Sequence, residues 1–254
     1  MDDGDLATRS DENYFDCMAR LAEAVTDQPA TRQPGLLLAS CRSPISLFNT
    51  AFLTGGGDPA ELIDQTRAFF EREGVSFVLR SRVGVHANLE RTAEANGLSK
   101  VDELPGMALA GIPAPPAPPA GFELRAVTDK AGLATHVGVL APAFGITAAL
   151  AEHLFSARLL DSPGTTAFVG FVDGAPVATS LVHLTGDTAG VYNVATALDR
   201  RKRGYGEAAT WGALEAGRQV GATVGVLQAS SMGLPIYERM GFRLVAPYEQ
   251  YVSD

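Results

Sequence analysis

The chain has 254 residues, of which 46% are hydrophobic and 19% charged, and its net charge is −9 at pH 7. This composition is that of one large or two small globular domains, and it excludes a wholly disordered or fibrous chain. The acidic balance disfavours nucleic acids and anionic membranes as partners. Cys17 and Cys41 form no C-x-x-C motif, so we expect no metal site and no disulfide framework. The sequence shows no secretion signal and no membrane span, which favours a cytoplasmic location.

The first half of the chain alternates expected helices and strands. A helix is expected at 12–25, before the first strand. The elements expected next are strand 36–40, strand 47–53, helix 58–73, strand 75–80, helix 86–96 and strand 104–112.

A proline-rich segment divides the chain. Residues 113–121 read PAPPAPPAG, and repeated proline favours an extended, semi-rigid spacer. We interpret the segment as a linker between a domain at 1–112 and a domain at 122–254. The alternatives are a surface loop within one domain and, with less support, a proline-rich ligand of the SH3 type.

The second half begins with helices and ends with alternating strands and helices. Thr166–Val172 and Ala175–Leu184, joined by Asp173-Gly174, form a strong hairpin signal. The elements expected around that hairpin are helices 129–140 and 148–160, strand 190–196, helix 204–220, strand 223–228, helix 234–240 and strand 242–252. This order indicates an α/β fold with a mixed sheet.

A basic, glycine-containing loop joins strand 190–196 to helix 204–220. Residues 201–206 read RKRGYG, an R-x-x-G-x-G pattern. Glycine allows close approach of the backbone to a ligand, and the first turn of a helix has unpaired N–H groups at its positive end. The loop therefore suits a multiply charged phosphate. It is neither a dinucleotide fingerprint nor a P-loop, and taken alone it could be a solvated basic turn.

Two segments resemble the GNAT superfamily of N-acetyltransferases, the first being VYNVATALDRRKRGYGEAA and the second LQASSMGLPIYERMGF. They occur in the family's order and spacing, and the resemblance covers roughly residues 122–254. It implies a GNAT-like α/β fold, with a mixed, mostly antiparallel sheet flanked by helices, and acetyl-CoA as acyl donor, with no metal.

The resemblance also implies roles for individual residues. The positions matching the family's pyrophosphate loop are Arg201, Lys202, Arg203, Gly204, Tyr205 and Gly206. The backbone of Val194, Ala195 and Thr196 matches the segment that pairs with the pantetheine arm and donates an N–H to the acetyl carbonyl. Such donors are typically worth about 10²–10³ in rate.

Tyr237 matches the tyrosine that the family uses as a general acid toward the departing thiolate. A phenol with a pKa of about 10 can protonate such an anion. The structural alternative for Tyr237 is an aromatic ring that fills the groove beside the last helix.

The sequence departs from the family pattern at several positions. Lys202 and Leu198 replace a common glycine and a common proline, which could change the stiffness of the loop. Ser230 stands where many members have an asparagine that contacts the cofactor arm, and serine has a shorter reach.

No general base is evident for the attacking amine. His183 is the best candidate by its ordinary pKa, and the alternative for it is a structural surface histidine. Glu152, His153, Asp187 and Glu249 are further candidates, as is a chain of waters.

The first half resembles the second at an offset of 144 residues. Phe48-Asn49 corresponds to Tyr192-Asn193, and Asn96-Gly97-Leu98 to Met240-Gly241-Phe242. The repeat suggests a duplicated fold. In the first copy the loop before Asp58 has no arginine, and Asp58 is expected to cap the helix. We interpret this half as a degenerate GNAT-like domain that shapes the acceptor pocket or completes the sheet; the alternative is an unrelated α/β module.

These observations favour an enzyme that transfers an acetyl group from acetyl-CoA to an amine of a small molecule or peptide, by direct attack in a ternary complex. The alternative is a CoA-binding regulatory module without acceptor chemistry. Nucleic-acid binding through Arg200–Arg203 is disfavoured by the net charge. The partners expected are the amine acceptor and, as an option left open, a second copy of the chain.

Overall fold

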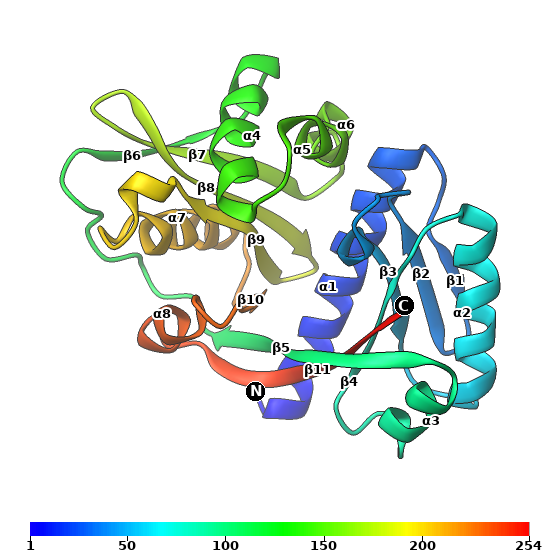
Figure 1. Ribbon diagram of the computed structural model, residues 1–254. Coiled ribbons are helices and arrows are strands. Elements are labelled where there is room, and N and C mark those ends of the chain that lie inside the picture. Colours follow the sequence, from blue (N-terminus) through cyan, green and yellow to red (C-terminus); the bar gives the residue numbers. More distant parts are fainter. Residues whose placement is uncertain (254) are drawn as a thin grey trace.

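One sheet of 11 strands runs through the whole molecule (Figure 1), and this computed structural model describes residues 1–253. The strand order is β1-β2-β3-β4-β11-β5-β10-β9-β8-β7-β6. The first-half strands are β1 (Thr31–Gln33), β2 (Leu36–Ser40), β3 (Asn49–Leu53), β4 (Val78–Arg82) and β5 (Leu98–Ala110). The second-half strands are β6 (Phe122–Ala126), β7 (Thr165–Val172), β8 (Ala175–Thr185), β9 (Thr188–Thr196), β10 (Val224–Gln228) and β11 (Arg243–Ser253).

Helices cover both faces of the sheet. They are α1 (Asp3–Thr26), α2 (Pro59–Glu73), α3 (Leu89–Ala95), α4 (Lys130–Phe144), α5 (Ala148–Leu154), α6 (Ala157–Leu160), α7 (Tyr205–Gln219) and α8 (Leu234–Arg239). Short 3-10 turns lie at Ser46–Phe48 and Leu198–Arg200. The mixed α/β sheet with flanking helices that the sequence predicts is thus confirmed.

The two halves repeat one order of elements. The first runs β2-β3-α2-β4-α3-β5 and the second β8-β9-α7-β10-α8-β11. In each half the first two strands of the repeat are antiparallel, and the next pair, β3 with β4 or β9 with β10, is parallel. The tandem arrangement of related halves that the sequence suggests is therefore visible in strand direction as well as in order.

The halves exchange strands at the centre of the sheet. Strand β5 pairs with β10 on one side and β11 on the other, and β11 also pairs with β4. Figure 1 shows β5 and the C-terminal β11 side by side across the middle of the molecule. The linker, residues 113–121, contains no helix or strand. Its place as a domain boundary stays a prediction, because both central strands cross between the halves.

Helix α1 bridges the two halves along one face of the sheet (Figure 1). Leu6 packs with Val224 and Val226 of β10, whereas Tyr14 packs with Phe52 of β3. The opposite face is covered by α2 and α3 in the first half and by α7 and α8 in the second. Helix α1 is longer than the expected 12–25. It begins at Asp3 because Asp2 caps its first turn, and not at the start of a hydrophobic run.

Several boundaries differ from those expected, each for a physical reason. Strands β1 and β6 were not expected, because both lie at sheet edges with mostly exposed side chains and lack an apolar run. Strand β5 starts at Leu98 rather than 104, because its charged first residues pair with β11 and are therefore extended. The helix expected at 148–160 breaks at Phe155-Ser156 into α5 and α6.

Within residues 1–253 no single helix is both long and apolar enough to cross a membrane. Helix α4 and residues 148–160 meet the length and composition only as a pair bent by 120°. Their apolar residues, including Val137, Leu140 and Leu154, pack in the core against the sheet.

Candidate cofactor and acyl-transfer site

The loop between β9 and α7 ends in an uncapped helix N-terminus. Gly204 is the N-cap residue of α7, with φ of 79°, and no side chain caps the first turn. Lys202 also has a positive φ, 61°. This backbone turns sharply and leaves the first N–H groups of α7 without side-chain partners, which favours an anion at that end.

The positive charges of this loop are free. Arg201, Lys202 and Arg203 are exposed, and none makes an ion pair with a carboxylate of residues 1–253. Arg200 differs, because its Nε lies 3.2 Å from Asp199 Oδ2. Arg201 donates a long hydrogen bond of 3.4 Å to the carbonyl oxygen of Ala143. The structure thus brings three uncompensated cations to the start of α7, as the sequence predicts.

Glycine at position 206 lets α7 approach β9 closely. A Cβ added to Gly206 would lie 3.0 Å from Thr196 Oγ1. Tyr205, by contrast, is buried, and its ring stacks on Phe122 at a centroid distance of 5.9 Å. Of these adjacent residues, only the backbone of Tyr205 is available to a ligand, whereas Gly206 keeps the helix start close to the strand.

Strands β9 and β10 diverge after a short parallel ladder. The ladder joins Val224–Val226 to Thr188–Gly190 and then ends. Beyond it, residues 191–196 of β9 pair with β8 on one edge but with no strand of the described chain on the other. We call residues 191–196 of β9 and 227–228 of β10 the fork. Its β9 side contains Val194, Ala195 and Thr196, with backbone groups that can pair with an extended ligand.

A β-bulge at Asn193 shapes the fork. Asn193 has φ of 52°, and the register with β8 shifts between Thr179 and Leu181. Thr179 Oγ1 donates to the carbonyl oxygen of Asn193 over 2.8 Å and holds this conformation. A bulge bends its strand and increases the local twist, so it turns β9 away from β10 where the fork opens.

Tyr237 lies on α8, on the same face of the sheet as α7. Burial raises the pKa of its phenol above the usual value, and the nearby Thr210 hydroxyl offsets part of the rise. The ring meets Phe242 edge to face at 6.0 Å, and a Cβ on Gly233 would lie 2.8 Å from it. The phenol therefore stays protonated at neutral pH and can serve as a proton donor.

Ser230 begins the turn that leads into α8. Its Oγ accepts a hydrogen bond of 3.2 Å from the Gly233 backbone N–H. The hydroxyl hydrogen remains free to donate, and the residue is exposed. Ser230 therefore supports the turn that presents Tyr237, and any contact with a cofactor arm stays a prediction.

His183 is a buried residue and not the surface histidine considered from the sequence. Its side chain is 1% exposed. Nδ1 lies 2.9 Å from Thr165 Oγ1, and Nε2 lies 3.0 Å from Asp16 Oδ2 on α1. Burial lowers the pKa of His183, and the Asp16 carboxylate raises it in part. Because both ring nitrogens are engaged, His183 as it lies has no nitrogen free to take a proton from an amine.

The other candidate bases fall into two groups. Asp187 binds Arg9 and accepts from Thr223 Oγ1 over 2.7 Å, and Glu249 accepts from Tyr251 Oη over 2.6 Å. Glu152 and His153 on α5 are exposed and have no side-chain hydrogen bond or ion pair within residues 1–253. Of this set, the two α5 residues alone keep free side chains.

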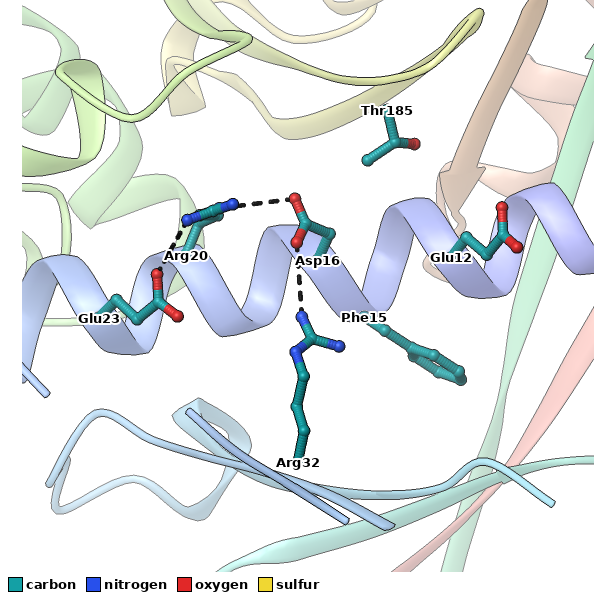
Figure 2. Close-up of a pocket in the computed structure, with 7 residues that line it drawn as sticks. All are labelled: Glu12, Phe15, Asp16, Arg20, Glu23, Arg32 and Thr185. Carbon is teal, nitrogen blue, oxygen red and sulfur yellow. Dashed lines mark hydrogen bonds and ion pairs between the residues drawn. The ribbon is translucent and has the colours of Figure 1, made fainter. Parts of the chain in front are cut away.

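A surface cavity of about 450 Å³ lies beside α1, and residues of α1, Arg32 of β1 and Thr185 of β8 line it (Figure 2). Arg32 and Arg20 flank Asp16, at 3.4 and 3.6 Å from its oxygens, and Arg20 also meets Glu23 at 3.2 Å. No residue of the basic loop or of α8 lines it. Asp16, Glu23, Arg20 and Arg32 are paired with one another, and no residue of the fork lines the cavity, so we assign it no part in the site.

Four features of the site were not expected from the sequence. Tyr192 and Asn193 both lie in an expected strand, and their counterparts in the repeat are Phe48 and Asn49. In the structure the Tyr192 hydroxyl donates to Asn13 Oδ1 on α1 over 2.7 Å. Gly190 gave a signal, since a strand glycine often marks close approach, and here a Cβ would collide with Asn13. Gln228 was visible as the one polar residue of strand VGVLQ.

No group of three or more histidine, cysteine, aspartate or glutamate side chains within residues 1–253 is arranged to hold a metal ion. The residues of the site can themselves bind an anion, pair with an extended ligand and donate a proton.

Comparison with known proteins identifies the fold. Residues 141–242 match the acetyltransferase (GNAT) family. A GCN5-related N-acetyltransferase from Kribbella flavida has the same fold, with a TM-score of 0.70, 20% identity and 95% coverage of both chains. A second, from Sphaerobacter thermophilus, gives a TM-score of 0.64 at 16% identity, covering 86% of this chain and 76% of that one.

The tandem arrangement also has a solved counterpart. A tandem GNAT protein from the clavulanic acid biosynthesis pathway gives a TM-score of 0.60 at 15% identity, covering 95% of this chain and 94% of that one. No curated protein matches the sequence significantly. Residues 141–242 thus match the GNAT family, and the whole chain has a fold like that of a tandem GNAT protein.

Proposed function

We propose that this GNAT domain transfers an acetyl group from acetyl-CoA to an amine of a small molecule or peptide, by direct attack in a ternary complex. The observation that carries the proposal is the free positive charge of Arg201, Lys202 and Arg203 at the uncapped start of α7, beside the fork between β9 and β10. A solvated basic turn would need neither the fork nor the close approach at Gly206.

Binding draws on separate parts of the site. The basic loop and the first N–H groups of α7 hold the pyrophosphate of the donor. The backbone of Val194–Thr196 pairs with the pantetheine arm along β9. One of its N–H groups points to the thioester carbonyl, where negative charge develops during attack.

The reaction requires movement of one acyl group and one proton. The amine nitrogen attacks the carbonyl carbon, a C–N bond forms and the C–S bond breaks. The Tyr237 hydroxyl gives its proton to the departing thiolate. The amine loses a proton to a chain of waters or to Glu152 or His153 at the exposed side of α5. Solvent returns a proton to the Tyr237 phenolate, so the net change is transfer of one proton from the amine to the thiolate.

One observation favours the alternative of a CoA-binding module without acceptor chemistry. His183, the best base by its ordinary pKa, is enclosed between Thr165 and Asp16. A protein that binds acyl-CoA only as a signal would need the basic loop but no base. Tyr237 favours the enzyme, because binding alone needs no proton donor at the thiol.

Calorimetry with acetyl-CoA tests the binding site. We expect replacement of Arg201, Lys202 and Arg203 together by glutamine to weaken binding by about 100-fold or more, since each charge-assisted contact is worth about 1.5–3 kcal/mol. A matched control replaces the exposed Arg125 and Arg218, which are already paired with Glu123 and Glu215. Equal affinity of the wild type and the triple variant would contradict the site.

A cytoplasmic location, the absence of nucleic-acid partners and a homodimer remain part of the proposal. The net charge of −9 supports the second of these.

A further inference from the structure

Strand β10 ends on a side-chain amide without a partner. The Nε2 and Oε1 atoms of Gln228 are both shielded from solvent, and neither has a hydrogen-bond partner within residues 1–253. A buried donor or acceptor left without a partner is destabilising. Gln250, by contrast, accepts from Arg80 Nε over 2.8 Å and donates to the carbonyl oxygen of Asp102 over 2.7 Å.

Gln228 lies where the fork opens. On one edge it pairs with Gly106 of β5, whereas on the other the ladder with β9 has already ended at Val226. Alternation along the strand places its side chain on the face of Val224 and Val226, under α1. This is the face opposite α7, so the amide lies across the fork from the basic loop.

We propose that Gln228 is a positioning residue for the acyl donor, whose side-chain amide exchanges a pair of hydrogen bonds with an amide of the pantetheine arm. The inference rests on the proposed function, which places that arm in the fork. An amide of the arm offers one N–H and one C=O, the complement of the donor and acceptor that Gln228 lacks. Rotation about the side-chain bonds brings the Gln228 amide into the fork.

The arm is thereby held from both strands. The β9 backbone holds it from one side, and the β10 side chain holds it from the other. Gln228 then distinguishes a complete CoA from a fragment that has the phosphates but no arm. The loop cations cannot make this distinction, because they bind the phosphates of both.

The test uses Gln228→Met, which keeps the length of the side chain and removes its polar atoms. We expect CoA to bind about 5- to 50-fold more weakly by calorimetry, because two neutral hydrogen bonds are lost. The adenosine bisphosphate fragment of CoA should bind the variant and the wild type equally. Without ligand, Gln228→Met should melt at a higher temperature than the wild type, whereas the control Gln250→Met should melt at a lower one.

The outcomes separate this inference from the proposed function. If the wild type binds CoA and Gln228→Met binds it equally well, the inference is wrong and the proposed function stands. If the variant melts at a lower temperature than the wild type, the amide has a partner in the protein and the inference is also wrong. If the wild type binds neither CoA nor the fragment, the proposed function fails, and the inference fails with it.

Discussion

The two halves of the sheet start their long helices in opposite ways. In the first half, Asp58 caps α2, and its Oδ1 accepts from the N–H groups of Ala60 and Glu61 at 2.9 and 3.3 Å. In the second half, the corresponding N-cap is Gly204, which has no side chain to accept these bonds. The same element order thus gives a helix start that carries its own negative charge in one half and a start that is open to an external anion in the other.

The halves also differ beside these helices. The parallel ladder between β3 and β4 runs to Leu53, the last residue of β3, whereas the ladder between β9 and β10 stops at Gly190. At the position that corresponds to Tyr237, the first half has the buried Ala93. The positive charges that are unpaired within residues 1–253, the fork and Tyr237 therefore occur together in the second half, and they distinguish it from the related first half.

Removal of the proton donor should give the largest effect. We expect Tyr237→Phe to lower kcat by about 100-fold with an amine acceptor, because general acid catalysis contributes on the order of 10²–10⁴. Affinity for acetyl-CoA should stay unchanged by calorimetry. Tyr251→Phe is the matched control, because Tyr251 lies on β11 but packs in the core of the first half; its turnover should equal that of the wild type. Unchanged turnover of Tyr237→Phe would make the ring a packing residue, equivalent to Ala93.

Lowering the pH should decrease the stability of the second half through His136, whose side chain is 1% exposed. Burial lowers the pKa of His136 to about 4, although its hydrogen bond to the Phe168 carbonyl opposes this. The unfolded chain, with a histidine pKa of about 6.5, therefore takes up a proton first as pH falls. The free energy of unfolding should then decrease by about 2 kcal/mol between pH 7 and about pH 5 from this residue.

Urea unfolding followed by fluorescence of the single tryptophan, Trp211 on α7, measures this decrease in the second half. We expect His136→Gln to remove about 2 kcal/mol of the pH dependence, while His153→Gln, at an exposed position, leaves it unchanged. An equal pH dependence in the wild type and His136→Gln would show that the folded chain protonates His136 as readily as the unfolded chain.

The smallest effect concerns the cap of the first half. Asp58→Ala should lower the free energy of unfolding by about 1 kcal/mol, the usual value of an N-cap. The exposed Asp64→Ala should change it by less than about 0.5 kcal/mol. Neither variant should gain affinity for CoA, since the β3/β4 ladder remains closed. Binding of CoA by Asp58→Ala at the first half would contradict the division between the halves.

Much of this comparison was predictable from local sequence. The Asp58 cap, the hairpin turn at Asp173-Gly174 and the basic loop before α7 each depend on a few neighbouring residues, and the structure confirms them. The apolar runs of β2, β8 and β10 likewise identify buried strands.

Features that depend on distant partners were not predictable. From the sequence His183 is a candidate base, but in the structure Asp16 of α1 contacts its Nε2. The bulge at Asn193 depends on the pairing of β9 with β8. The unpaired side-chain amide of Gln228 depends on where the ladder between β9 and β10 ends. Such properties come from the tertiary arrangement and leave no periodic pattern in the sequence.

The exchange of strands at the centre of the sheet has a consequence for synthesis of the chain. Strand β4 has β3 on one side, but its other neighbour is β11, which pairs Val252 with Val78. During synthesis on the ribosome, the first half therefore emerges long before β11. The edge of β4 that pairs with β11 stays unpaired while the second half is made. Unpaired strand edges are prone to aggregate. The two halves must therefore finish folding together, because the sheet closes only after β11 has been made.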